Sequence, residues 1–177
     1  MRVGATLEQL VKEYNGKVRV VFKNLVVHPQ TVARAHLAGC AAANQGKFKE
    51  YYNLFWEKGF KAYQESRDAS KMGEEAILSW VSSVGIDPAK LKADMDGQDC
   101  KGLIDSDAAE MRKFRVGSTP SFFINGKYVA GAMDAGAFKQ LIERELKIVE
   151  ASGVPAAEYY EKVVMGKGEK AFKAAGK

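Results

Sequence analysis

Two cysteines and one proline-containing loop are the parts of this chain whose residue types could take part in chemistry. Cys40 and Cys100 stand far apart, and the sequence contains no Cys-x-x-Cys. This spacing excludes a vicinal dithiol and a four-cysteine zinc site within the printed residues. Both cysteines fall on the apolar faces of predicted helices, where a cysteine often packs as a small buried hydrophobic side chain.

The two histidines do not complete a metal site. His36 precedes Cys40 by one helical turn, which could supply half of a metal site, but no second pair has ligand spacing. His28 stands before Pro29 after a predicted strand, where we expect it to cap the loop. No glycine-rich phosphate loop occurs, so we expect neither a metal nor another cofactor.

The proline-containing loop leads into a predicted β-hairpin. Gly117-Ser118-Thr119-Pro120 precedes the apolar run Phe122-Phe123-Ile124, and Asn125-Gly126 separates this run from a second one. Pro120 has no N–H, so it suits the first residue of a strand, and Asn-Gly favours a two-residue turn. The apolar run suits a strand buried on both faces. The bond before Pro120 could be cis, because proline cuts the trans preference to roughly 0.5–1 kcal/mol.

Apolar periodicity predicts the elements that position this hairpin. Helical spacing predicts helices on both sides of it, and β-branched residues predict one strand before it. The predicted helices are 5–14, 31–45, 48–56, 74–84, one that starts at Asp87-Pro88, 98–114, 134–149 and 155–165. The predicted strand is Val18–Lys23, and residues 57–73 are expected to form an irregular connection. This order indicates an α/β fold with helices inserted in its middle.

Composition is that of an ordinary globular protein. The chain has 177 residues, of which 46% are hydrophobic and 28% charged, and its net charge is +5. Its dispersed lysines predict a solvated basic surface, whereas a nucleic-acid site would show clustered arginine and aromatic residues. No apolar run reaches the length of about 18 residues that a membrane-spanning helix needs. The first residues also lack the apolar core of a signal peptide.

Four motifs in series resemble the DsbA-like branch of the thioredoxin superfamily. They are Gly16–Asn24 (GKVRVVFKN), His28-Pro29, Gln45–Phe48 (QGKF) and Val116–Gly126 (VGSTPSFFING). The resemblance covers about residues 2–147 in the order and spacing of the family. It implies a thioredoxin-like fold with an inserted helical subdomain and extracytoplasmic thiol–disulfide exchange. It also implies that Pro120 is the cis-proline facing the active site, although Ser118 stands where the family often has glycine.

The resemblance and the element pattern together divide the chain. They imply a thioredoxin-like α/β domain from 1–24 and 115–150, an inserted helical subdomain from 28–114, and a C-terminal helix with a basic tail from 151–177. Thr119 and Pro120 are then the site residues. The implied partners are thiol- or disulfide-bearing proteins or peptides, in the periplasm or another extracytoplasmic compartment.

The main departure from the family lies at the N-terminus. In the family a strand leads into a Cys-x-x-Cys motif that opens the first helix, whereas Met1–Leu7 resembles the segment just after the second cysteine. Exchange needs a thiolate at a helix N-terminus and a resolving thiol nearby. The printed chain lacks this dithiol and the first strand. We expect that the native product starts further upstream; the alternative is a non-catalytic peptide-binding or chaperone-like relative.

A missing first strand predicts an unusual sheet. In the family fold this strand lies between the segments that correspond to Val18–Lys23 and Phe122–Ile124, so its absence leaves unpaired edges on both. Each buried backbone group without a partner costs about 1–3 kcal/mol. We therefore expect a gap, a rearranged pairing, or a strand donated by another copy in a strand-complemented homodimer.

The family's oxidising environment adds a second interpretation of Cys40 and Cys100. The two cysteines could form a structural disulfide that links the inserted helices, or they could remain two buried thiols. A redox pair that replaces the missing dithiol is disfavoured, because burial raises the pKa of a thiol and slows its attack. The sequence leaves the first two alternatives open.

Overall fold

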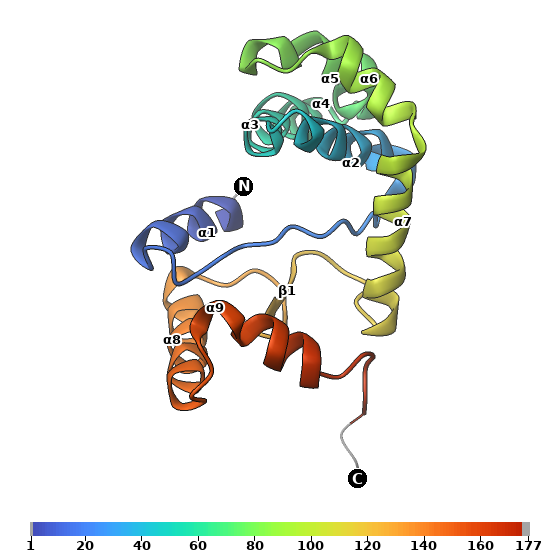
Figure 1. Ribbon diagram of the computed structural model, residues 1–177. Coiled ribbons are helices and arrows are strands. Elements are labelled where there is room, and N and C mark those ends of the chain that lie inside the picture. The colour runs from blue at the N-terminus through green and yellow to red at the C-terminus, as the bar shows by residue number, and fades with distance from the viewer. Residues whose placement is uncertain (1, 175–177) are drawn as a thin grey trace. The chain divides into compact units, whose positions relative to one another are not determined.

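The computed structural model describes residues 2–174, which form two compact units (Figure 1). One unit consists of Met1–Phe22 and Arg112–Lys177, and the other consists of Lys23–Met111. Each unit has a buried hydrophobic core of its own. The domain limits that the sequence suggests stay a prediction.

Lys23–Met111 is a helical unit. Its helices are α2 (Pro29–Asn44), α3 (Phe48–Leu54), α4 (Lys61–Ser66), α5 (Glu74–Trp80), α6 (Pro88–Asp96) and most of α7 (Gln98–Lys113). Helix α2 packs against α3, α5 and α6, and small buried residues such as Ala38 and Ala41 let these helices approach closely. Ile77, Leu91 and Met95 are buried beside them, so the core of this unit forms around α2.

Residues 57–73 are largely helical, so the predicted irregular connection is wrong. Helix α3 continues through a π-helical turn (Phe55–Phe60) into α4, and a short 3₁₀ turn (Ala69–Met72) follows. Aromatic side chains continue at helical spacing across the turn, and the rings of Trp56 and Phe60 meet edge to face with centroids 4.6 Å apart. Polar residues of this stretch occupy the solvent-exposed side of the helix, which is why they do not end it.

Helix α6 begins where the sequence predicts. The side chain of Asp87 accepts hydrogen bonds from the backbone N–H groups of Ala89 and Lys90, and Pro88 lies in the first turn. An Asp at the N-cap followed by Pro is favoured because it satisfies exposed donors and needs none from proline. The preceding 3₁₀ turn (Val81–Val84) ends at Gly85, whose φ is 75°.

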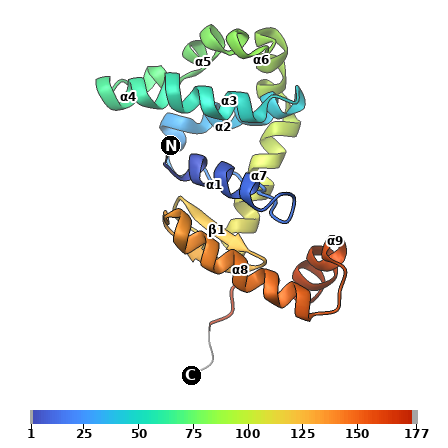
Figure 2. The same cartoon turned by 90° about the vertical axis from the view of Figure 1, so that its left-hand side faces the viewer.

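The other unit combines a hairpin with helices from both ends of the chain. Its elements are α1 (Arg2–Glu13), β1 (Ser121–Ile124), β2 (Lys127–Ala130), α8 (Ala135–Ala151) and α9 (Ala156–Tyr159), which continues as a π-helix (Tyr160–Met165). Leu10 of α1 is buried together with Phe138 and Ile142 of α8. Figure 2 shows the hairpin beside α8, and the rings of Phe122 and Phe138 meet edge to face at 5.0 Å. Helix α8 therefore supports the hairpin.

The hairpin has the turn that the sequence predicts. Strands β1 and β2 pair antiparallel, with Ile124 opposite Lys127. Asn125 and Gly126 both have positive φ, 46° and 83°, as a two-residue turn with right-handed strand twist requires. Strand β1 is not buried on both faces, however, because Phe123 is 38% exposed. That prediction is wrong, since the core of this unit contacts only the face of β1 that carries Phe122.

The predicted strand Val18–Lys23 is wrong for the residues that the structure describes. Their sheet has two strands, β1 and β2, and residues 18–22 form an extended coil (Figure 1). No backbone hydrogen bond joins residues 18–21 to the rest of the described chain. Val20 and Val21 are 49% and 63% exposed. β-branched residues favour an extended backbone, but an extended segment becomes a strand only where a neighbour supplies hydrogen-bond partners. Among the described residues this segment is therefore unpaired, and the choice between a gap and a strand donated by another copy stays a prediction.

Candidate functional site

The loop that carries Thr119 and Pro120 joins the end of α7 to β1 and is exposed to solvent. The Thr119–Pro120 peptide bond is cis, and residues 117–120 are all exposed. Val116, just before them, is buried and fixes the start of the loop in its unit. The loop thus offers a surface on which another molecule could lie.

Side-chain and backbone hydrogen bonds hold this loop against the hairpin. The Ser121 hydroxyl donates to the backbone carbonyl of Ser118 at 2.8 Å, and its oxygen lies 3.2 Å from the Tyr128 hydroxyl on β2. The Gly131 N–H donates to the Pro120 carbonyl at 2.9 Å. These contacts order both sides of the proline. The side chains of this loop include no nucleophile stronger than a hydroxyl. The loop can therefore bind a partner, but it supplies no thiolate. The assignment of Thr119 and Pro120 as site residues stays a prediction.

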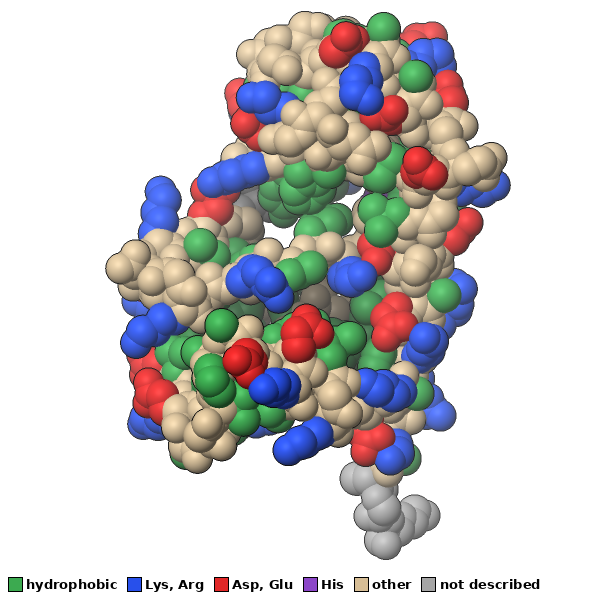
Figure 3. All heavy atoms as spheres, viewed as in Figure 1, with side chains coloured by type: hydrophobic (Ala, Val, Ile, Leu, Met, Phe, Trp, Pro, Cys, Tyr) green, Lys and Arg blue, Asp and Glu red, His purple; other side chains and the backbone are tan. Residues whose placement is uncertain are grey.

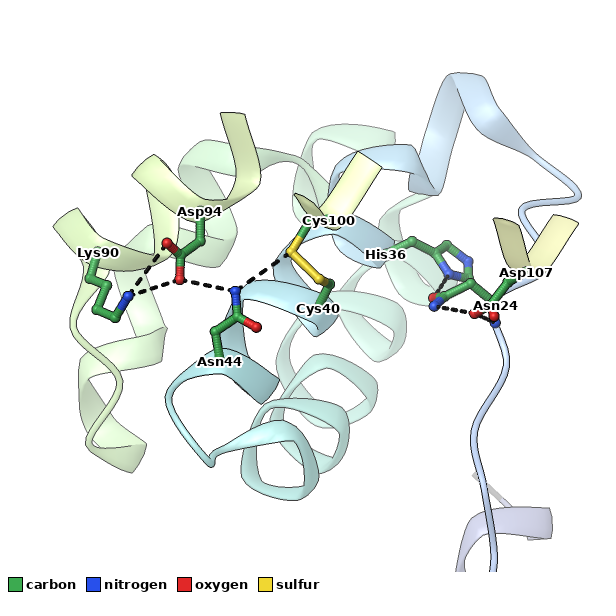
Figure 4. Close-up of a disulfide and its surroundings, with 8 residues drawn as sticks. All are labelled: Asn24, His36, Cys40, Asn44, Lys90, Asp94, Cys100 and Asp107. Carbon is green, nitrogen blue, oxygen red and sulfur yellow. Dashed lines mark hydrogen bonds and ion pairs between the residues drawn. A yellow bond between two sulfur atoms is a disulfide. The ribbon is translucent and has the colours of Figure 1, made fainter. Parts of the chain in front are cut away.

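Cys40 and Cys100 form a disulfide, with an S–S distance of 2.03 Å. The bond joins α2 to α7 in the helical unit (Figure 4). Cys40 is 9% exposed and Cys100 is fully buried, and the Asn44 amide lies 4.0 Å from the Cys100 sulfur. Of the alternatives left open by the sequence, the disulfide is the one found. Burial shields it from attack by thiolates, so its place in the structure is that of a cross-link.

A polar cluster around a buried carboxylate, which sequence reasoning missed, joins the end of the extended segment to α2 and α7. We call it the Asp107 cluster; it consists of Lys23, Asn24, His36 and Asp107. Asp107 is 3% exposed. Its Oδ2 accepts from the Asn24 backbone N–H at 2.8 Å and from the Asn24 amide Nδ2 at 3.0 Å, and its Oδ1 accepts from Lys23 Nζ at 2.9 Å. Figure 4 shows Asp107, Asn24 and His36 side by side.

The hydrogen bonds of the Asp107 cluster determine the charge state of its carboxylate. Burial by itself would raise the pKa of Asp107, but the hydrogen bonds from Asn24 and Lys23 together outweigh it, so the pKa lies below its ordinary value. Asp107 is therefore an anion at neutral pH. In the sequence, the polar pair Lys23-Asn24 at the end of an apolar run could have indicated a polar contact at this point. Nothing near the pair in the sequence indicated that its partner is the carboxylate of Asp107.

His36 belongs to the Asp107 cluster. Its Nδ1 lies 3.0 Å from the Asn24 Oδ1, and burial lowers the pKa of its imidazole. The sulfur of Cys40 is committed to the disulfide. Within residues 2–174, no group of three His, Cys, Asp or Glu side chains is placed to hold a metal ion. His28 lies at the N-cap of α2, where its backbone carbonyl, not its side chain, accepts the first hydrogen bonds.

The surface carries charges of both signs. On the face seen in Figure 3, lysine and arginine side chains alternate with aspartate and glutamate. Among the helices that the structure describes, none has the length and apolar character that crossing a bilayer requires.

The comparison with protein families agrees with the fold and the loop described above. A family model described as thioredoxin matches residues 2–144, which include the cis-proline loop, the hairpin and the helical unit. The chain therefore belongs to this thioredoxin family. Its fold is of the thioredoxin-like α/β type with helices between the two parts of the α/β unit.

The chain is also similar to individual proteins. The chain is 25% identical over 139 residues to disulfide bond formation protein D of Bacillus subtilis, an alignment that covers 75% of this chain and 59% of that protein. It is 28% identical over 147 residues to a probable disulfide bond formation protein D of Bacillus cereus, covering 80% of this chain and 65% of that protein. A Na(+)/H(+) antiporter NhaA of Herminiimonas arsenicoxydans is 23% identical over 149 residues, 84% of this chain and 22% of that protein. No solved structure matches the chain.

These relatives are longer than the aligned region. The chain spans about three fifths of the two disulfide bond formation proteins and about one fifth of the antiporter.

Proposed function

We propose that this chain is the thioredoxin-like part of a thiol–disulfide oxidoreductase that acts on exported proteins. The observation that carries the proposal is the exposed Thr119–Pro120 loop at the start of β1, in a chain of the thioredoxin family whose relatives include disulfide bond formation proteins. The cis-proline loop lies beside the redox dithiol in the family that the sequence resembles, so the same loop here is the expected docking surface for substrate.

The proposed reaction is a pair of thiol–disulfide exchanges with a dithiol that the described residues do not contain. When the oxidoreductase acts as an oxidant, a substrate thiolate attacks the disulfide of the Cys-x-x-Cys, and one cysteine leaves as a thiolate. A second substrate thiolate then attacks the mixed disulfide, so the substrate gains a disulfide and the dithiol is reduced. Both cysteines of this chain are in the Cys40–Cys100 bond, so the proposed reaction needs a dithiol that the printed residues do not supply.

The loop residues would act by binding. Pro120 has no N–H, so its position leaves room for an extended substrate backbone to pair with the N–H and C=O of the neighbouring Thr119. The Ser121 hydroxyl, bonded to the Ser118 carbonyl, keeps the loop open for that pairing. Thr119 and Pro120 thus position the substrate, and the electrons pass between sulfur atoms only.

The Cys40–Cys100 disulfide supports an extracytoplasmic site of action. Disulfides persist in oxidising compartments and are rare where glutathione and thioredoxin keep thiols reduced. A buried disulfide in the helical unit fits a protein that folds in the periplasm or outside the cell. Its substrates would be exported proteins or peptides that carry thiols or disulfides.

A non-catalytic module that binds extended peptides is the second candidate. Val20 and Val21 are exposed, and residues 18–21 have no backbone hydrogen-bond partner within residues 2–174. Both observations favour this candidate, because an unpaired extended segment can accept another strand. The strand could also come from a second copy, which would make a strand-complemented homodimer. Light scattering distinguishes these cases: a dimer that Val21→Lys converts to a monomer supports complementation, whereas a monomer at all concentrations excludes it.

A turnover assay tests the enzyme proposal. The native protein is purified from its own cells and added to reduced, unfolded ribonuclease in a glutathione buffer. The recovery of ribonuclease activity is then followed. We expect catalysis above the glutathione background and a reduction of about tenfold in Pro120→Ala, which corresponds to about 1.4 kcal/mol of transition-state binding. Pro155→Ala, an exposed proline of the same unit, is the matched control. Peptide binding without catalysis would favour the second candidate.

A further inference from the structure

The C-terminal segment, residues 155–174, lies beyond the part of the chain that the thioredoxin family model matches. It nevertheless belongs to the same compact unit as the cis-proline loop and contacts that unit along its length. The guanidinium of Arg19 lies 5.5 Å from the centre of the Tyr160 ring. A Cβ at Gly126 would lie 3.4 Å from Val164 Cγ1, so the segment also lies against the hairpin turn.

The end of the C-terminal segment meets the residues from which the cis-proline loop starts. The Phe172 N–H donates to the Lys113 carbonyl at 2.8 Å, and the guanidinium of Arg115 lies 4.5 Å from the centre of the Phe172 ring. Lys113 is the last residue of α7, so its carbonyl is one of those that have no partner within the helix. Phe172 therefore satisfies an acceptor at the helix end and places an aromatic ring against a cation at the same point.

Arg115 turns the chain out of α7 through an unfavourable backbone conformation. Its φ is 57°, in the left-handed region that a residue with a Cβ enters at a cost and where glycine is usual after a helix. Its N–H donates to the Arg112 carbonyl at 3.1 Å. Val116, the next residue, is buried, and the exposed loop follows. Because the contact with Phe172 lies at this turn, it stabilises the conformation that directs the loop.

We propose that Phe172 is a positioning residue for the cis-proline loop. It holds the end of the loop that follows α7, while the hydrogen bonds of Ser121 and Gly131 hold the end that enters the hairpin. Without the Phe172 ring, the turn at Arg115 keeps fewer contacts, and the loop after it samples more conformations. The effect on substrate docking rests on the proposed function, whereas the effect on the order of the loop does not.

Other contacts hold the neighbours of Arg115 rather than its side chain. The rings of Phe114 and Phe123 meet edge to face with centroids 5.4 Å apart, and Val116 is buried. Within residues 2–174, the Arg115 side chain has its ring contact with Phe172. Removal of that ring should therefore act on Arg115 and the loop and leave the packing of the hairpin in place.

NMR order parameters of the backbone amides test this role with matched variants of the full chain. Phe172→Ala removes the ring, Phe172→Tyr keeps one, and Met165→Ala shortens another exposed apolar side chain of the same segment. In Phe172→Ala we expect the order parameters of Arg115 and residues 117–119 to fall from the rigid range of about 0.85 toward the flexible range below about 0.6. Phe172→Tyr and Met165→Ala should keep the wild-type values. A lower urea midpoint of Phe172→Ala with unchanged order parameters would overturn the proposal in favour of a purely structural role.

A double-mutant cycle tests whether the contact between Arg115 and Phe172 carries the effect. We expect Arg115→Gln to lower the same order parameters as Phe172→Ala does. The double variant should be no lower than either single variant, because both changes remove one shared contact. Arg112→Gln, at an exposed arginine in the last turn of α7, is the control and should leave the loop unchanged. Additive losses in the double variant would overturn the assignment to this contact.

Peptide binding separates this proposal from the proposed function. The probe is a short extended peptide with one blocked cysteine. We expect Phe172→Ala to bind it about twofold to fivefold more weakly than the wild type, the factor that one cation–π contact at an exposed site is worth, and Phe172→Tyr to bind it as the wild type does. Wild-type affinity in Phe172→Ala would show that Phe172 does not position the loop for docking. A wild type that binds no peptide would instead contradict the proposed function, and the order parameters alone would then decide whether Phe172 holds the loop.

Discussion

Asn24 and Asp107 stand 83 residues apart in the sequence and share two hydrogen bonds, both to the same carboxylate oxygen, at 2.8 and 3.0 Å. The bond from the Asn24 backbone holds the chain at the entry to the helical unit, and the bond from its side chain aligns the amide toward His36. This contact links the first residues of the helical unit to its last helix. Its strength should depend on pH because it requires the ionised form of Asp107.

Protonation of Asp107 at low pH should lower the free energy of unfolding. The hydrogen bonds that lower its pKa favour the ionised form in the folded state, so its contribution to stability is present above the unfolded-state pKa of about 3.9 and is lost as the pH falls through the folded-state value. We expect the urea midpoint of the wild type to fall more steeply below about pH 4 than that of Asp107→Asn. Parallel curves for wild type and Asp107→Asn would show that Asp107 makes no such contribution.

Protonation of His36 should also lower the free energy of unfolding, but in a higher pH range. Burial lowers the pKa of His36, so the unfolded chain binds a proton at a higher pH than the folded chain does. Stability should therefore fall as the pH drops from about 6.5 toward the lowered folded-state pKa. In His36→Gln the urea midpoint should depend less on pH between about pH 7 and 5 than it does in the wild type. A His36→Gln variant that keeps the wild-type pH dependence would contradict this assignment.

The disulfide should be the largest single contribution to the stability of the helical unit. Its cysteines are 60 residues apart, and closing a loop of that length costs the unfolded chain about 4 kcal/mol of conformational entropy at 25 °C. We expect the Cys40→Ala, Cys100→Ala double variant to lose about that free energy of unfolding in urea titrations. Because the bond is buried, the native protein should react slowly with a small thiol. Rapid reduction under native conditions would argue for a redox role instead.

Two glycines should respond in opposite directions to the same substitution. Gly126 has a φ of 83° in the hairpin turn, so Gly126→Ala should cost about 1 kcal/mol or more. Gly102 lies within α7 with open space around the position of a Cβ, so Gly102→Ala should stabilise the protein by about 0.5–1 kcal/mol. Thermal or urea unfolding of the two variants checks both. A destabilising Gly102→Ala would mean that the helix needs a glycine there.

Local chemistry made parts of the fold predictable from the sequence. Asn125-Gly126 and Asp87-Pro88 have strong intrinsic preferences for a turn and a helix start, and both lie where the sequence places them. The motifs around Pro120 indicated the family, which the family model supports. These features depend on a few neighbouring residues and little on the rest of the chain.

Features that depend on distant contacts could not be predicted in the same way. Val18–Lys23 has the composition of a strand, but strand formation depends on a partner that is not among the described residues. Leu103, an apolar residue of the predicted helix 98–114, is 46% exposed. It lies at the edge of the α7 face whose middle carries the buried residues Cys100 and Asp107. The burial of Asp107 could not be predicted from its neighbours in the sequence, since an acidic residue in a helix is ordinarily exposed. Its burial depends on the hydrogen bonds from Asn24, which is distant in the sequence.

Docking of substrate on the Thr119–Pro120 loop is the central claim, and NMR chemical shifts of the backbone amides test it most directly. The titration uses a short extended peptide with one blocked cysteine. Pro155→Ala is the control and Pro120→Ala the test variant. We predict shifts concentrated at Gly117–Ser121 in the wild type and in Pro155→Ala, with binding weakened about tenfold in Pro120→Ala, a loss of about 1.4 kcal/mol. Shifts that avoid this loop, or equal binding by all three proteins, would contradict the account.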